Sequence, residues 1–200
     1  MQKLLFCLIF LPLLSYATGV SVMANTRHTW DVYYTSPSAK RFFIYEDTDH
    51  VNAQSISGGE LFYKTQEQTV WIIFTCWQEK MESCARFINL KTAQESPIFI
   101  KPALAINQNQ ETMGPLANFK ENVVVTFNYP SDWQYTVTPI FKPCKHPFVY
   151  PLQHLSDGPD AGSAFLPNGS LHLNMLMNAG PNQSVTIPID YKKLYADCAS

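Results

Sequence analysis

Cysteine is the residue of this sequence most able to do chemistry, because its thiol can be a nucleophile, a metal ligand or half of a disulfide. The chain has five cysteines, and Cys7 lies in an apolar segment near the N-terminus. The other four are separated by 8, 60 and 54 residues, and zinc sites usually show closer Cys-x-x-Cys pairs. We therefore expect two disulfides among these four residues, which are Cys76, Cys84, Cys144 and Cys198. Three pairings are open, and we favour Cys76 with Cys84, across a turn, and Cys144 with Cys198.

A proline-rich segment holds a second group of reactive side chains, His146, His154, Asp157 and Asp160. Imidazole and carboxylate groups act as general acids, general bases and metal ligands. A small secreted hydrolase or metal-dependent enzyme with a site near these residues is therefore the alternative function. No Gly-x-Ser-x-Gly or Ser-x-x-Lys motif accompanies them, so the sequence assigns no catalytic residue and favours a non-enzymatic protein.

His172, Met175 and Met177 form a third group, and such side chains bind copper in oxidising compartments. If this segment is a strand, alternation places His172 on the face opposite both methionines. The three side chains then cannot meet on one ion. We expect a surface histidine, core methionines and no metal or cofactor.

Aromatic side chains are abundant, with 4 Trp, 10 Tyr and 13 Phe. An exposed row of aromatic residues on a sheet can dock a protein or stack on a sugar. Three residues are candidates to point outward and form such a binding surface: Tyr33, Trp71 and Trp77. Packing in the core is the simpler explanation for each of them.

The segment 69–90 is predicted to be the centre of the fold. Its first half alternates two apolar sets, Val70, Ile72 and Phe74 on one face and Trp71 and Ile73 on the other. Because both faces are apolar, this strand should be covered on both sides. The polar segment 78–83 then predicts a turn that leads into a second strand, and the pair forms a hairpin.

Further strands are predicted wherever β-branched and aromatic residues alternate with polar ones between turn signals. These segments are 29–35, 41–45, 51–56, 60–65, 97–100, 122–129, 133–141, 170–177 and 184–191. Segment 116–119 is expected to form one helical turn, and the prolines of 141–167 exclude central strands there. The fold class is all-β, a disulfide-stabilised antiparallel β-sandwich, or alternatively a β-barrel, of about ten short strands with one or two long Pro-rich loops.

The N-terminus resembles an export signal in its composition. A short basic start precedes the apolar segment Leu4–Leu14, which is too short to cross a bilayer. We expect a secretory signal peptide over residues 1–17, alternatively ending at residue 24, then a flexible lead over 18–28 and one β-sandwich domain over 29–200. The protein is then secreted or periplasmic, with no transmembrane segment after signal removal.

Charge and composition narrow the function. The chain has 14 basic and 16 acidic residues, which leaves no positive surplus for nucleic acid. Together with the predicted fold, this favours an exported non-enzymatic module that binds a protein or glycan, or a structural part of a periplasmic or extracellular assembly.

Overall fold

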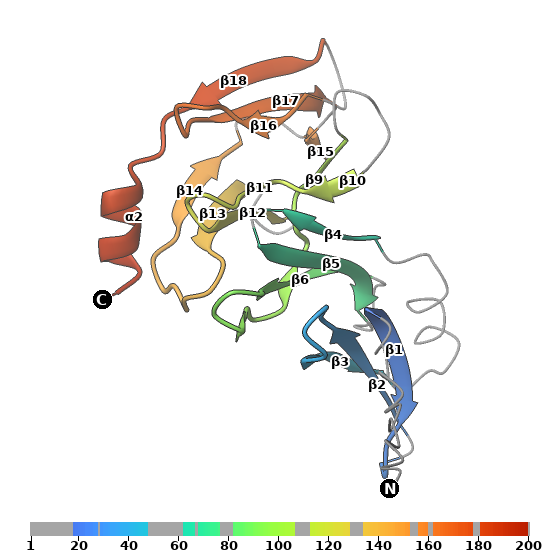
Figure 1. Cartoon of the computed structure of the whole chain (residues 1–200). Helices are drawn as coiled ribbons and strands as arrows, with labels where there is room; N and C mark the ends of the chain where they lie inside the picture. Colours follow the sequence, from blue (N-terminus) through green and yellow to red (C-terminus); the bar gives the residue numbers. More distant parts are fainter. Residues whose placement is uncertain are drawn as a thin grey trace, which may run out of the picture.

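A computed structural model describes residues 18–27, 29–47, 62–66, 68–76, 82–106, 113–128, 134–152, 156–159, 162–177 and 181–199. Their regular secondary structure is β-strand, apart from a short helix near the C-terminus (Figure 1). The strand pairs within this part of the chain are antiparallel. The predicted fold class, a disulfide-stabilised antiparallel β-sandwich, is confirmed.

The N-terminal sheet contains β1 (Gly19–Ala24), β2 (Trp30–Thr35) and β3 (Arg41–Asp47), in that order. The strand β1 lies within segment 18–28, for which the sequence predicted a flexible lead. All six of its residues pair with β2, and Val20 and Val22 pack against the apolar cluster behind the sheet. Signal cleavage after residue 17 would keep this strand, whereas cleavage after residue 24 would remove it.

The second sheet contains the predicted hairpin. It has β4 (Phe62–Gln66), β5 (Thr69–Cys76), β6 (Glu82–Asn89) and β7 (Gln94–Glu95), and β8 (Phe99–Ile100) also pairs with β6. The strands β5 and β6 pair along their full lengths, from Thr69 opposite Asn89 to Cys76 opposite Glu82. The predicted hairpin over 69–90 is therefore confirmed.

The third sheet contains β11 (Ala117–Asn118), β12 (Val123–Asn128), β13 (Gln134–Pro139) and β14 (Phe148–Pro151), and β9 (Leu104–Ile106) pairs with β10 (Met113–Pro115) beside it. The predicted helical turn over 116–119 is wrong. The Leu116 N–H donates to the Ala103 carbonyl, and the Leu116 carbonyl accepts from Val125. Backbone groups used by neighbouring segments in this way cannot close a helical turn.

The fourth sheet contains β15 (Ser156–Pro159), β16 (Ala164–Phe165), β17 (Leu171–Met177) and β18 (Gln183–Ile187), and the other three strands all pair with β17. The helix α2 (Tyr191–Asp197) follows, so the predicted strand over 184–191 ends too late. Pro188 lacks an N–H for the ladder, and Asp190 caps the helix by accepting from the Lys193 N–H.

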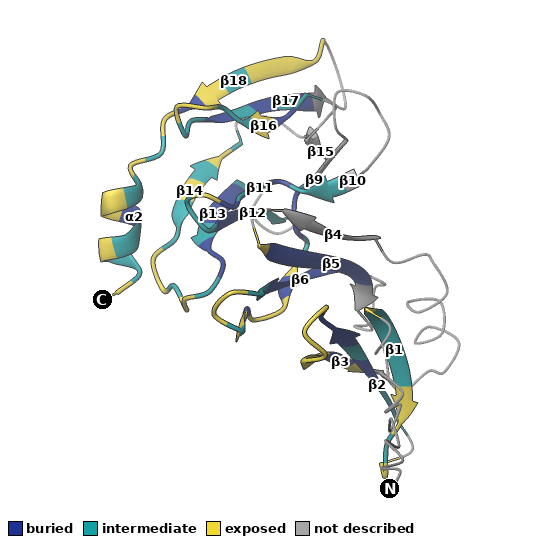
Figure 2. Ribbon diagram, in the orientation of Figure 1, coloured by how far each residue is buried: buried dark blue, intermediate teal, exposed yellow. Residues whose placement is uncertain are grey.

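Three apolar clusters lie between successive larger sheets, so the four larger sheets of the described residues form a series (Figures 1 and 2). One face of β5 and β6 packs against β2 and β3, and their other face packs against β12. The far face of β12 and β13 packs against β17, β18 and Leu194 of α2. The two inner sheets are therefore covered on both faces, as the apolar pattern of 69–74 predicts.

A disulfide closes the C-terminal half of this series. Cys144, in the loop before β14, is bonded to Cys198 at the end of α2, with the two Cα atoms 4.3 Å apart. This predicted pairing is confirmed. Cys84 is also disulfide-bonded, but the side chain of Cys76 lies outside the described residues, so the Cys76–Cys84 pairing stays a prediction.

The proline-rich segment supplies only peripheral strands where it is described. The strand β14 is last in its sheet, and β15 pairs with β17 alone. The prediction of no central strand there is confirmed for this part of the chain. No helix among the described residues is long and apolar enough to cross a membrane.

Candidate functional site

The outward side of the N-terminal sheet carries aromatic, sulfur-containing and charged side chains. Tyr34 and Phe42 point inward and are buried, so alternation directs Tyr33 and Phe43 outward, where they are paired across β2 and β3. Phe43 is 37% exposed, and Met23 on β1 is 45% exposed. We define the outer N-terminal face by these outward side chains and their polar neighbours: Met23, Asp31, Tyr33, Arg41, Phe43 and Glu46.

A β-bulge in β3 decides which residues reach this face. Val32 pairs with Tyr45 and Tyr33 pairs with Phe43, so Ile44 is the additional residue. Ile44 and Tyr45 are consequently both buried, although they are consecutive. Strict alternation from Phe42 would have turned Glu46 toward the core, and the bulge turns it outward instead.

Cationic and aromatic side chains form a row across the face. The guanidinium carbon of Arg41 lies 5.4 Å from the centre of the Tyr33 ring. The Tyr33 and Phe43 rings are 5.7 Å apart and inclined by 69°, an edge-to-face contact. The guanidinium carbon of Arg86, from β6, lies 5.8 Å from the centre of the Phe43 ring. Each cation is thereby drawn to the electron-rich face of an aromatic ring.

Arg86 fixes this row to the second sheet. It donates to the carbonyl of the bulged residue Ile44 at 2.6 Å and to the Glu95 carboxylate at 2.8 Å. Burial lowers the pKa of Arg86, and the charge of Glu95 raises it. Because an arginine stays protonated in proteins, these contacts keep a charged anchor against β3.

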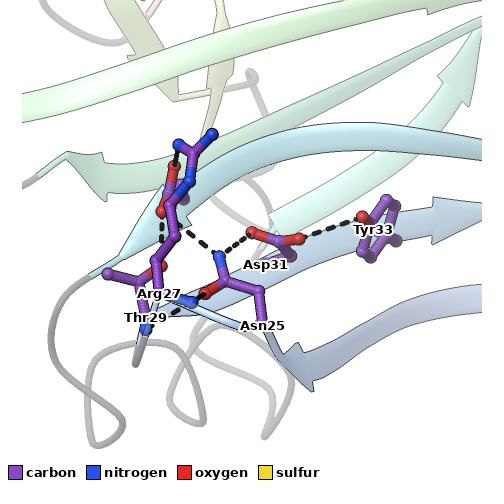
Figure 3. Close-up of polar contacts among 6 residues, drawn as sticks. Asn25, Arg27, Thr29, Asp31 and Tyr33 are labelled. Atoms are coloured by element: carbon purple, nitrogen blue, oxygen red, sulfur yellow. Dashed lines mark hydrogen bonds and ion pairs between the residues drawn. The ribbon is translucent and has the colours of Figure 1, made fainter.

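A polar network lies at one end of the face (Figure 3). The Asn25 amide donates to Asp31 at 2.8 Å and to Glu46 at 3.2 Å. The Thr29 hydroxyl also donates to Glu46, and the Tyr33 hydroxyl donates to Asp31 at 3.1 Å. Both carboxylates are therefore occupied by donors from their own sheet.

These contacts change two pKa values. Partial burial raises the pKa of Tyr33, as do the hydrogen bond to Asp31 and its charge, while Arg41 lowers it. The hydrogen bonds from Thr29 and then Asn25 lower the pKa of Glu46, and Arg27 contributes in the same direction. Tyr33 is therefore held neutral and oriented, and Glu46 is held ionised.

The polar network does not suit Glu46 as a general acid. Asp31 and Glu46 accept from the same Asn25 amide, so two carboxyl groups lie near one another. Glycoside hydrolysis uses such a pair, but one member must carry a proton, which requires a raised pKa. The lowered pKa of Glu46 does not meet this requirement.

The three aromatic residues predicted as a binding surface have different positions. Tyr33 lies on the outer N-terminal face. Trp71 is only 5% exposed and packs between the second and third sheets, so it belongs to the core and not to a surface. Trp77 lies outside the described residues.

The residues of the alternative enzyme site are described only in part. His146 is exposed in the loop after Cys144. His154, Asp160 and the side chain of Asp157 lie outside the described residues. Where side chains are described, no group of three or more His, Cys, Asp or Glu is placed to hold a metal ion.

His172 and Met175 lie on opposite faces of β17, as the sequence predicts. Met175 is buried in the apolar cluster between the third and fourth sheets, which we call the third apolar cluster. His172 contacts the Thr186 hydroxyl at 3.0 Å on the outward side. Asn174 accepts from the Ser184 hydroxyl at 2.6 Å on that same side. The side chain of Met177 lies outside the described residues. The outward face of the C-terminal sheet is therefore polar along this pair of strands.

Sequence reasoning missed Met23, Arg41 and Phe43. Met23 fell in the segment expected to be a flexible lead. Phe42 and Phe43 are chemically identical neighbours, so alternation alone did not say which one points outward. The register with β2 settles this, because Tyr33 is opposite Phe43.

Comparisons of the chain with protein-family models, with curated proteins and with solved structures found no match.

Proposed function

We propose that this protein is an exported, non-enzymatic binding module that docks a partner protein on its outer N-terminal face. The supporting observation is the contrast between the outward faces of the two end sheets. Each end sheet needs an apolar inner face to pack on its neighbour, and neither needs an apolar outer face. The C-terminal sheet presents His172, Asn174, Ser184 and Thr186 outward, whereas the N-terminal sheet presents a different set: Met23, Tyr33, Arg41 and Phe43.

The residue types on the outer N-terminal face are those that dominate protein interfaces. Tyrosine, phenylalanine, methionine and arginine are enriched in interface cores. Tyrosine and arginine also often account for most of the binding free energy. Exposed Met23 and Phe43 add apolar area that a partner would remove from water, which is favourable in proportion to the area buried.

A protein suits this face better than a glycan, which is the alternative ligand. Sugar rings stack on open aromatic faces. The guanidinium of Arg41 already lies over the Tyr33 ring, and Phe43 meets that ring at 69° and not in the same plane. An uneven surface of rings and a cation is typical of protein recognition.

Export is supported by the disulfide between Cys144 and Cys198. Disulfides persist in the periplasm and outside the cell and are rare in reducing compartments. Together with the predicted signal peptide, the disulfide supports an exported protein, and we expect its partner in the same compartment.

The test compares two double variants that differ only in which outer face they alter. Met23→Ser with Phe43→Ser removes the apolar part of the proposed docking face, and His172→Ala with Thr186→Ala alters the opposite face. Each oxidised protein is cross-linked in its native exported fraction, and the captured proteins are identified by mass spectrometry. We expect the same partner with the wild type and the second variant, and its loss with the first. Equal recovery by both variants, with unchanged circular dichroism, would contradict the proposal.

A further inference from the structure

Arg41 brings an unneutralised positive charge to the outer N-terminal face. Its guanidinium donates to the Met23 sulfur at 3.1 Å and lies over the Tyr33 ring. The ion pairs among the described residues join Arg27 to Glu46 and Arg86 to Glu95, and neither involves Arg41. Neither a thioether sulfur nor an aromatic ring cancels a full charge. The exposed Arg41 therefore keeps most of its capacity to bind an anion.

The nearby carboxylates are already committed to other donors. Asp31 accepts from Asn25 and from the Tyr33 hydroxyl. Glu46 accepts from Asn25 and Thr29 and lies 3.6 Å from Arg27. Neither acid forms an ion pair with Arg41. The described carboxylates of this face therefore leave Arg41 able to bind a further carboxylate.

We propose that Arg41 binds an aspartate or glutamate carboxylate of the partner protein, with an adjacent apolar side chain of the partner resting on Met23 and Phe43. This inference rests on the proposed function, because it assigns the partner's chemistry at that face. Nη1 of Arg41 donates to Met23, and the edge formed by Nε and Nη2 of a guanidinium can still match a carboxylate with two parallel hydrogen bonds. The apolar neighbours on either side lower the local polarity and strengthen this contact.

The recognised element is therefore a protein segment in which an acidic residue neighbours an apolar one. The acidic residue gives the complementary charge, and the apolar residue covers the methionine and the phenylalanine. A segment with only the acidic residue would leave Met23 and Phe43 exposed, and a segment with only the apolar residue would leave Arg41 without a carboxylate. Lysine at position 41 would keep the charge but lose the planar, two-pronged geometry.

The test selects a random-peptide display library on the immobilised, oxidised full-length protein and measures the affinity of each enriched peptide by fluorescence anisotropy. We expect enriched peptides to contain Asp or Glu beside an apolar residue. Arg41→Gln should weaken binding about tenfold or more, and Arg41→Lys by an intermediate factor. Replacing the acidic residue of the peptide with its amide should weaken binding by the same factor as Arg41→Gln. Because both changes remove the same contact, the two together should weaken binding no more than either change alone. Lys91→Gln removes one positive charge from an exposed turn elsewhere and should change affinity less than about twofold.

The outcomes separate this inference from the proposed function. If peptides lose affinity for the Met23→Ser, Phe43→Ser variant but not for Arg41→Gln, the face docks proteins and the carboxylate inference is overturned. If enriched peptides bind all variants equally, or none is enriched, both proposals fail. Circular dichroism and thermal unfolding of each variant confirm that affinity, and not folding, has changed.

Discussion

The two end sheets of this protein solve the same packing problem in different ways. The C-terminal sheet is joined to its neighbour by an apolar cluster, a helix and a disulfide, and the outward face of its strands is polar. The N-terminal sheet is joined to its neighbour by an apolar cluster and by Arg86, and the outward face of its strands carries aromatic, sulfur-containing and cationic side chains. The inner faces are alike because the fold requires them. The outer faces differ, and so do the contacts that link each end sheet to its neighbour. These differences are not required by the fold and therefore point to function.

The joint at the C-terminal end depends on tyrosines as well as on the disulfide. The Tyr191 hydroxyl donates to the Gly169 carbonyl, and the Tyr195 hydroxyl donates to the Glu121 carbonyl at 2.6 Å. Leu194, between them, is buried in the third cluster. Gly169 has a φ of +85°, and a Cβ there would lie 2.9 Å from the Tyr191 ring. The chain therefore approaches α2 so closely that only glycine fits.

The largest expected effect comes from removing the disulfide. Cys144→Ser with Cys198→Ser releases a loop closed over 54 residues, and we expect a loss of about 4 kcal/mol in the free energy of unfolding. Urea unfolding without reductant measures this loss. If the two ends act independently, the remaining folded variant should bind peptides at the outer N-terminal face with unchanged affinity. Weaker binding by the folded variant would show that the ends are coupled.

The next effect concerns the joint at the N-terminal end. Arg86→Met leaves the Ile44 carbonyl without its donor and Glu95 without its partner, so we expect a loss of about 2 kcal/mol. Urea unfolding again gives the value. Glu95→Gln is the matched control, because it removes only the more exposed half of the contact and should cost under about 1 kcal/mol. Equal losses in both variants would mean that the bond to Ile44 contributes little.

A smaller effect is expected at the tyrosine contacts of α2. Tyr195→Phe removes a donor to the Glu121 carbonyl and should lower the free energy of unfolding by about 1 kcal/mol.

The same tyrosine should make stability depend on pH, because burial, and then the charge of Glu121, raises the pKa of Tyr195. The neutral form is thus favoured by folding. This contribution is complete below the ordinary tyrosine pKa of about 10 and is lost as the pH rises through the higher folded value. Unfolding free energies measured across that alkaline range should fall more steeply for the wild type than for the variant.

The smallest expected effect concerns the polar network of the outer N-terminal face. The pKa of Glu46 is lowered by Thr29 and Asn25, so the ionised form is favoured by folding. The resulting stability is complete above the ordinary glutamate pKa of about 4.3 and disappears as the pH falls through the lower folded value. Melting temperatures measured across this acidic range should decline less in Glu46→Gln than in the wild type. If the melting temperatures of the wild type and Glu46→Gln decline in parallel as the pH falls, Glu46 does not contribute to the pH dependence of stability.

Sequence patterns predicted the interior of this protein well because burial is periodic. The alternation from Val70 to Phe74 predicted a strand covered on both sides, and both of its faces lie in apolar clusters. Trp71 lies on one of these two covered faces, so its burial agrees with this pattern and with core packing, and not with its place among the candidates for a binding surface.

The site itself was only partly predictable, because two local features hide it. The bulge at Ile44 reverses the alternation within β3, and a periodic pattern cannot show an added residue. The strand β1 is short and gains its order by pairing with β2, so its composition alone did not mark it. Tyr33 was identified because its strand alternates regularly. Arg41 and Phe43 required the register between strands.

The bond from Arg86 to the bulged Ile44 also changes the hydrogen-bonding groups that β3 can offer to another chain. A side strand with free carbonyl and amide groups is a template onto which another chain can add, and this is a common route to aggregation. At β3, a bulge interrupts that template, and a partly buried cation from the neighbouring sheet occupies one of its carbonyls. The residue that joins the two sheets thus also removes one acceptor from this flank, and we expect strand addition to be less favourable here than on a regular edge.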